Sequence, residues 1–168
     1  MAHRGIVVYG SRVLREQCKP VEEITPEVQE FINGMFATLK RAKGLGLSAP
    51  QVGDTRRLFI LDLSSVSLEH DKMVFINPEI TERDGEQIGE EGCLSFPGLY
   101  LEIPRAQKIV CEFTDLEGNR LELEAEGLAA RAIQHELDHL NGKLFIDYLA
   151  PADRELISGK LKKIKATN

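Results

Sequence analysis

The sequence predicts an α+β fold in which a central helix packs against largely antiparallel β-sheets, with an N-terminal and a C-terminal helix beside it. Two observations predict this class. Stretches with helical spacing of apolar residues alternate irregularly with strand-like runs, and a turn-forming stretch joins the last two runs into an expected hairpin. The length of 168 residues and a hydrophobic content of 42% suit a single domain that spans residues 1–168 and has one core.

The first expected helix covers 26–43. Thr25 followed by Pro26 is typical of an N-cap and a first helical position, apolar residues then recur at helical spacing, and Gly44 is expected to end the helix. Four strand-like runs follow this helix, at 57–63, 73–80, 108–115 and 120–127. The stretch DLEGNR between the last two runs is a turn signal, so these two runs are expected to pair.

The second expected helix is the central one, which covers 128–142 and ends at Gly142. A third, basic helix rich in lysine is expected at 151–168. Ahead of the strands, the stretch GLGLSAPQVG at 44–53 contains glycines that allow close backbone approach. We interpret it as a strand edge that lines a cleft, from which Gln51 directs an amide donor at a reacting carbonyl.

The composition argues against several classes of protein. No apolar run approaches the roughly 18–20 residues that a membrane span needs, and the start lacks the apolar core of a secretory signal. A net charge of −6 argues against bulk affinity for nucleic acid. We therefore expect a cytoplasmic protein that enters no membrane and binds no DNA. The three cysteines are odd in number, which argues against a disulfide framework and leaves at least one as a free thiol or a metal ligand.

The stretch QHELDH at 134–139 carries the strongest chemical signal. His135 and His139 are four positions apart, so they lie on one face of the expected helix and can bind one cation. Glu136 lies between them and can act as general base on a water bound to that cation, which is the HExxH arrangement of metal-dependent hydrolases. A polar surface helix is the alternative, but apolar residues at helical spacing give the same helix a buried side.

A catalytic centre of this kind needs a third protein ligand and an open position. Cys93, in the stretch EEGCLSFPG, is the best candidate for that ligand and is expected in irregular backbone. Cys111 lies inside an apolar run and is interpreted as a core residue, while Cys18 has no evident partner. Two imidazoles and one thiolate can hold a borderline metal such as Fe(II), Zn(II) or Ni(II).

Three stretches together resemble the peptide deformylase family, namely GLGLSAPQ at 44–51, EGCLS at 91–95 and QHELDH at 134–139. They stand in the family's order, and the similarity extends along nearly the whole chain. Ser48 is a departure, since alanine is usual at that position. The resemblance implies an enzyme that removes the formyl group from the N-terminal formylmethionine of newly made polypeptides and releases formate.

The resemblance also implies roles at the expected metal centre. The implied metal ligands are Cys93, His135 and His139. Glu136 is the implied catalytic acid and base. Iron(II) is the metal that the family usually prefers, and Zn(II), Ni(II) or Co(II) are expected to substitute for it. Asp138, the remaining polar residue of the motif, is expected either to pair with Arg105 or to be exposed on the helix.

Further implied roles concern the substrate. Gln51 and the backbone N–H of Leu94 would hold the formyl oxygen, and Gly46 would pair with the substrate backbone. The methionine side chain would enter an apolar pocket formed by Leu45, Leu128 and Ala132. Arg131 and Gly89 stand where some members of the family carry apolar residues, which leaves the selectivity for this side chain open.

The lysine-rich end suggests a partner. Four lysines lie close together there, at positions 160, 162, 163 and 165, on a chain whose net charge is −6. The resemblance implies that this helix docks on the ribosome. A solvated helix end whose positive charges complement the helix dipole is the alternative.

Two other functions stay open on the residues alone. An HExxH metallopeptidase would take a histidine or glutamate as third ligand, and Glu126 is the nearby acidic candidate. A non-catalytic module with a structural metal would need a fourth side-chain ligand. The remaining histidines are His3 and His70, and neither is expected to serve, because one is close to the chain start and the other stands in a polar loop.

Overall fold

The structure, a computed structural model, describes residues 5–66 and 71–168. The helices in these ranges are α1 (Pro26–Ala42), α2 (Gly127–Leu140), α3 (Pro151–Leu156) and α4 (Ser158–Lys165). The strands are β1 (Gly46–Ser48), β2 (Leu58–Asp62), β3 (Lys72–Asp84), β4 (Gln87–Cys93), β5 (Phe96–Arg105), β6 (Lys108–Thr114) and β7 (Arg120–Glu126). Short 3₁₀ turns complete the set: η1 (Arg12–Arg15), η2 (Ala49–Val52) and η3 (Phe145–Tyr148).

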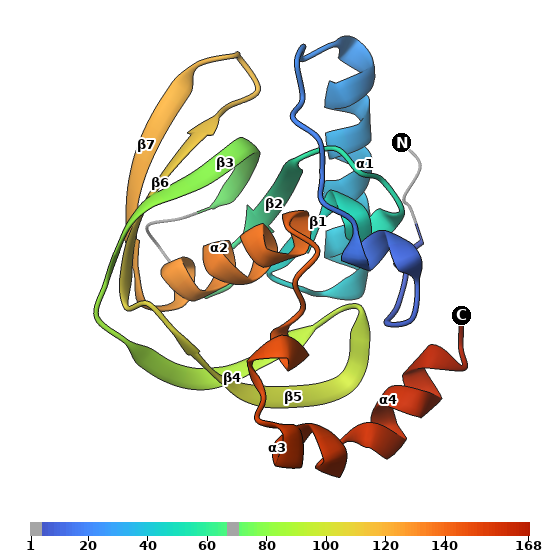
Figure 1. Cartoon of the computed structure of the whole chain (residues 1–168). Coiled ribbons are helices and arrows are strands. Elements are labelled where there is room, and N and C mark those ends of the chain that lie inside the picture. Colours follow the sequence, from blue (N-terminus) through green and yellow to red (C-terminus); the bar gives the residue numbers. More distant parts are fainter. Residues whose placement is uncertain (1–4, 67–70) are drawn as a thin grey trace.

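Two antiparallel sheets surround α2. Strands β1, β2, β3, β6 and β7 pair in this spatial order, and β4 pairs with β5 in a second sheet. Helix α2 lies in the middle of the molecule, with β3, β6 and β7 to one side of it and the β4–β5 hairpin below it (Figure 1). It packs against β1, β2, β6 and β7. The expected α+β class with a central helix is therefore confirmed.

Strand β2 is buried on both faces. Its successive side chains belong alternately to two apolar clusters, each of which packs on a different helix. Phe59 and Leu61 belong to the apolar cluster that packs on α2, while Leu58 and Ile60 belong to the cluster that packs on α1. Successive side chains of a strand point to opposite faces, so one strand serves both clusters. The Phe59 ring stacks on Phe75 of β3, with ring centroids 4.6 Å apart.

The boundaries of the two long helices follow the sequence closely. The backbone N–H of Val28 donates to the side chain of Thr25 at 3.2 Å, as predicted for an N-cap. Helix α2 starts at Gly127, and Gly142 follows its end with a φ of 72°, as expected of a helix-ending glycine. The end of α1 differs, because Lys43 rather than Gly44 adopts the left-handed conformation, with a φ of 59°.

The β4–β5 hairpin is the element that the sequence did not predict. Gly89 and Gly92 lie inside β4, and Pro97, Gly98 and Pro104 lie inside β5. Glycine and proline are depleted in strands, so a stretch that contains this many of them does not have the composition typical of a strand. Cys93, which was expected in irregular backbone, is the last residue of β4 and stands where the pairing with β5 shifts register.

The C-terminal segment is helical but is not one continuous helix. Helices α3 and α4 are separated at Ile157, whose ψ of 4° departs from helical geometry. Leu161 and Ile164 of α4 are buried, and the four lysines of this helix are exposed. Of the helices in the described ranges, none is long and apolar enough to cross a membrane.

Candidate active site and metal centre

Three side chains that suit a metal ion converge between β4 and α2. Cys93, His135 and His139 each offer a ligand atom, and these atoms all lie within 4.8 Å of one another. The Sγ atom of Cys93 is 3.4 Å from Nε2 of His139. The pairing of β4 with β5 shifts register between Gly92 and Cys93, and such an irregularity re-aims a side chain. The structure thus brings together the three side chains that the sequence predicted as metal ligands.

The centre is buried and fits a single divalent cation. One buried polar atom near it, Oε1 of Glu136, has no hydrogen-bond partner among the described residues. Leaving a buried polar atom unpaired is unfavourable, so this oxygen indicates a place built for a polar ligand. A thiolate with two imidazoles suits Fe(II), Zn(II), Co(II) or Ni(II), and three protein ligands leave a fourth position open.

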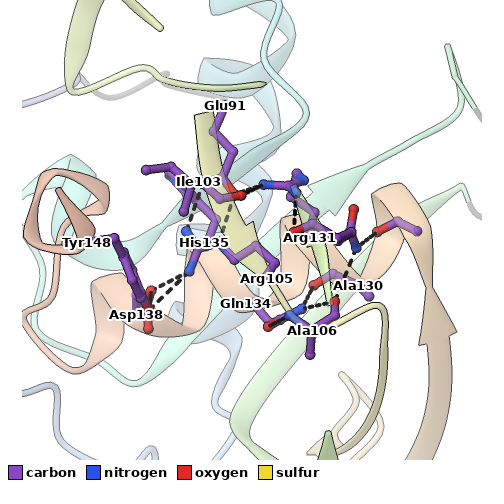
Figure 2. A network of polar contacts seen from close by, with 12 residues as sticks. Glu91, Ile103, Arg105, Ala106, Ala130, Arg131, Gln134, His135, Asp138 and Tyr148 are labelled. Atoms are coloured by element: carbon purple, nitrogen blue, oxygen red, sulfur yellow. Dashed lines mark hydrogen bonds and ion pairs between the residues drawn. The ribbon is translucent and has the colours of Figure 1, made fainter. Parts of the chain in front are cut away.

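A carboxylate outside the ligand set organises the centre. Glu91 is buried, and Figure 2 shows that it receives hydrogen bonds from several elements. Nδ1 of His135 lies 2.8 Å from Oε1 of Glu91. Arg105 donates to both oxygens at 2.8 Å, and Arg131 donates to Oε2 at 2.6 Å. Because Nδ1 of His135 donates to Glu91, its Nε2 is left to face the metal centre.

The same contacts fix the charge of Glu91. Burial by itself would raise the pKa of this carboxyl, but the hydrogen bonds from Arg105 and His135 outweigh burial and lower the pKa to about 2. Glu91 is therefore ionised at neutral pH, as a carboxylate must be if it is to accept a hydrogen bond from every partner.

The two histidines have different surroundings. Burial lowers the pKa of His139 well below its ordinary value, so this imidazole is neutral, which is the form that binds a metal. Burial also lowers the pKa of His135, but hydrogen bonds with Cys93 and Glu91 raise it well above its ordinary value. A cation that binds His135 must therefore displace a proton.

A further layer of contacts anchors α2 behind the ligands. Arg105 donates to Asp138 at 2.7 Å, so the expected pairing of these two residues is confirmed. The Tyr148 hydroxyl also donates to Asp138 at 2.7 Å. The Gln134 amide donates to the carbonyl of Ala106 at 3.0 Å and accepts from its N–H at 3.0 Å. These bonds hold α2 against the end of β5.

Glu136 lies on the buried side of α2 next to strand β1. A Cβ atom built on Gly46 would lie 2.8 Å from Oε2 of Glu136, so a glycine is needed for the backbone to approach the carboxylate this closely. Burial raises the pKa of Glu136 to about 7. A carboxyl group with this pKa can both accept and return a proton at neutral pH.

The Gln51 amide has a fixed orientation beside the ligands. Its Oε1 accepts hydrogen bonds from the backbone N–H and the hydroxyl of Ser48, both at 3.0 Å. This leaves Nε2 on the other side, where it donates to Ser95 at 3.1 Å and lies 3.6 Å from Sγ of Cys93. Ser48, the departure noted above, thus contributes a buried donor that alanine would lack.

A pocket of about 400 Å³ opens beside the ligands. It is lined by the predicted substrate-binding residues Leu45, Gly46, Leu128 and Ala132, and also by Gln51, Leu94, Glu136 and two of the ligands, Cys93 and His135. Leu128 is 45% exposed and stands at the mouth of the pocket. Arg131 adds a charged group to a wall that was expected to be apolar.

Comparison with known proteins agrees with this geometry. The sequence profile of the polypeptide deformylase family matches residues 3–155. This chain belongs to that family. It is 46% identical to the peptide deformylase of Chromobacterium violaceum over 168 residues, which cover 100% of this chain and 99% of the relative. It is 42% identical to the peptide deformylase of Thermodesulfovibrio yellowstonii over 165 residues, which cover 98% of this chain and 100% of that one.

The solved structures of polypeptide deformylases share the whole fold. The crystal structure of a peptide deformylase from Legionella pneumophila aligns with a TM-score of 0.91 at 42% identity, covering 99% of this chain and 97% of that chain. Members of the family are metal-dependent enzymes that hydrolyse the N-formyl group of nascent peptides, so this chain is a formyl-removing hydrolase. Cys93, His135 and His139 form a group that could hold a metal ion.

The alternative ligand sets gain no support from the described residues. Glu126, considered as a third ligand for a metallopeptidase, is the exposed N-cap of α2 and is not a member of the ligand cluster. His3 and His70, considered as a fourth ligand, lie outside the described residues.

Sequence reasoning missed the roles of Glu91 and Arg131. Arg131 was treated only as a doubtful member of the side-chain pocket, and Glu91 only as part of the EGCLS stretch. One local signal was available, because Arg131 and His135 are four residues apart and so share a helix face. No local pattern reveals that β4 brings Glu91 to that face.

Breaking the Glu91 network is expected to destabilise the fold. Glu91→Gln should lower the free energy of unfolding by about 3–5 kcal/mol, because it leaves buried guanidinium groups without their charged acceptor. The matched control is Glu90→Gln at the exposed neighbouring position, which should change stability by less than about 0.5 kcal/mol. Urea unfolding of both metal-free proteins measures the difference, and equal stability of the two variants would contradict the role of Glu91.

Proposed function

We propose that Cys93, His135 and His139 hold one divalent metal ion and that Glu136 moves the protons in the hydrolysis of N-formylmethionyl polypeptides. One observation carries the proposal. A buried carboxyl group whose pKa is raised to about 7 lies on the same helix as two of the three clustered ligands and lines the same pocket. The amide bond of the formyl group is the bond that breaks, and formate and a free amino terminus are the products.

Glu136 acts first as base and then as acid. When bound, a divalent cation supplies Lewis acidity that makes water easier to deprotonate. Glu136 accepts the proton of the attacking water, whose oxygen forms a bond to the formyl carbon. The carbon–nitrogen bond then breaks, and Glu136 returns the proton to the leaving amine. General acid–base catalysis of this kind contributes roughly 10²–10⁴ in rate.

Gln51 and Leu94 stabilise the negative charge that builds on the formyl oxygen. The Gln51 amide is held by Ser48 with its Nε2 near Cys93, which is where a donor is needed. The backbone N–H of Leu94, next to Cys93, is the second donor. Loss of one such donor typically lowers the rate by roughly 10²–10³.

The substrate backbone pairs with β1, and its methionine side chain enters the pocket. Strand β1 is the terminal strand of its sheet, so its outer edge at Gly46 can accept an extended peptide. The apolar walls for the methionine side chain are Leu45, Leu128 and Ala132. Pairing through the backbone depends little on which side chains follow the methionine, which suits an enzyme that acts on many different polypeptides.

Glu136→Gln tests the mechanism. The metal-loaded variant should keep its metal, because the three ligands remain, while turnover of a formyl-Met peptide falls by at least roughly 10²-fold. The matched control is Glu126→Gln, which alters an exposed residue at the start of the same helix. Metal content and formate release are measured on the same sample. Near-normal turnover by metal-loaded Glu136→Gln would refute the assigned role.

We propose Fe(II) as the native metal, with Zn(II), Ni(II) and Co(II) as substitutes. The ligand set accommodates all four ions, so oxygen chemistry rather than affinity should distinguish them. Iron-loaded protein should lose activity within hours in air and keep it without oxygen, because Fe(II) and its thiolate ligand are both readily oxidised. Nickel-loaded protein should be stable in both conditions. An iron form that is as stable in air as the nickel form would contradict this choice.

We propose that the whole chain, residues 1–168, acts as one cytoplasmic catalytic domain, and that the basic helix at 151–168 docks on the ribosome. The support is the row of exposed lysines on α4, whose apolar residues Leu161 and Ile164 are buried on the other side. Phosphate contacts would make such binding strongly dependent on salt.

Charge removal tests the docking without disturbing the packing of α4. Replacing Lys160, Lys162, Lys163 and Lys165 by glutamine should weaken cosedimentation with ribosomes at low salt and leave peptide turnover unchanged. The control replaces four exposed lysines elsewhere, namely Lys19, Lys40, Lys72 and Lys108. Equal cosedimentation of the two variants would show that α4 is not the docking element.

A further inference from the structure

Arg131 is a buried arginine that connects α2 to both strands of the β4–β5 hairpin. Only 6% of its surface is exposed. Its Nη1 donates to Glu91 at 2.6 Å and to the carbonyl of Ile103 at 2.8 Å, and its Nη2 donates to the carbonyl of Gln87 at 3.4 Å. Arginine is rarely buried unless it is paired, so these contacts account for its position.

Gly89 provides the space in which the guanidinium group lies. A Cβ atom at position 89 would be 3.1 Å from Nη2, 3.3 Å from Cζ and 3.4 Å from Nε of Arg131, which indicates that the flat group faces the glycine. Gly89 pairs with Ile103 in ordinary strand geometry and has no positive φ. Backbone conformation therefore does not require a glycine here, whereas the guanidinium does.

Glu91 needs this contact to keep its place relative to α2. Arg105 reaches Glu91 from β5, the neighbouring strand of the same hairpin. Arg131 is the donor from α2 other than His135 itself, and it lies one helical turn before His135. It therefore fixes the carboxylate with respect to the helix that carries the ligand His135.

We propose that Arg131 and Gly89 form a coupled unit that positions Glu91, and through it His135, for metal binding. Arg131 is thus a positioning residue, and it acts without contact with the reacting atoms. The inference rests on the proposed function, because it assumes that His135 is a metal ligand. It predicts that filling the space at Gly89 and removing the guanidinium of Arg131 both weaken metal binding.

The test is a double-mutant cycle in cobalt-loaded protein. Arg131→Met keeps an unbranched side chain as far as the position of Nε and removes the rest of the guanidinium with its charge, and Gly89→Ala adds one methyl group against the guanidinium. The readouts are the dissociation constant for Co(II) by chelator competition and the absorption spectrum of bound Co(II). Far-UV circular dichroism monitors the fold. A purely structural role would lower thermal stability without changing the spectrum of bound Co(II).

Arg131→Met should weaken Co(II) binding by roughly 10-fold or more, as is typical when a partner of a metal ligand is lost. Gly89→Ala should weaken it in the same direction and by less. The double variant should bind no more weakly than Arg131→Met alone, because the methyl group has no guanidinium left to displace. The matched controls are Arg120→Met and Gly159→Ala, which lie away from the centre and should leave binding unchanged.

Specific outcomes would overturn the inference. Unchanged Co(II) affinity and spectrum in Arg131→Met, or additive losses in the double variant, would show that the unit does not position His135. If Arg131→Met fails to fold, Gly89→Ala keeps every polar group and decides by itself. A parent protein that binds no stoichiometric Co(II) would remove the proposed function together with this inference, whereas normal binding by parent and variants would remove the inference alone.

Discussion

The buried carboxylate of Glu91 is the interaction on which the rest of the centre depends. A charge inside a protein is tolerated only when it is paired and fully hydrogen-bonded. Glu91 meets this requirement with donors from β5 and α2, supplied by Arg105, Arg131 and His135. Cys93 is two residues further along β4, so the contact that satisfies Glu91 also sets the distance between the Cys93 sulfur and the helix with the two imidazoles.

The remaining groups are placed by regular structure. The period of α2 puts His135, Glu136 and His139 on its buried side, and the apolar residues of the same helix pack on the strands. β1 carries Gly46 to the Glu136 carboxylate, and η2 follows directly with Gln51. Groups on helices and strand ends keep their geometry better than groups on long loops, which favours a preorganised centre.

Local sequence patterns were sufficient for the elements whose signals are local. The helix at Pro26–Ala42, the central helix and the β6–β7 hairpin follow from periodicity, capping residues and turn chemistry, and HExxH located two of the clustered ligands. The β4–β5 hairpin was not predicted, because no local pattern explains why glycines and prolines occur within its strands. Gly92 lies under the ring of Tyr100, and Gly89 lies against Arg131, more than 40 residues away. The Glu91 network joins residues from three elements, so it becomes visible only once they are packed.

The distance along the chain between the clustered ligands has a consequence for how the protein matures. Cys93 and His139 are 46 residues apart in sequence, and β5, β6 and β7 form between them. Ordering a loop of this length is entropically unfavourable until the strands pair, so the unfolded chain has no preformed site for a cation. Under the proposed function, metal binding would then be a late event that only the folded chain can complete. A bound ion would stabilise the finished topology, and the apparent stability of the protein would rise with the concentration of free metal.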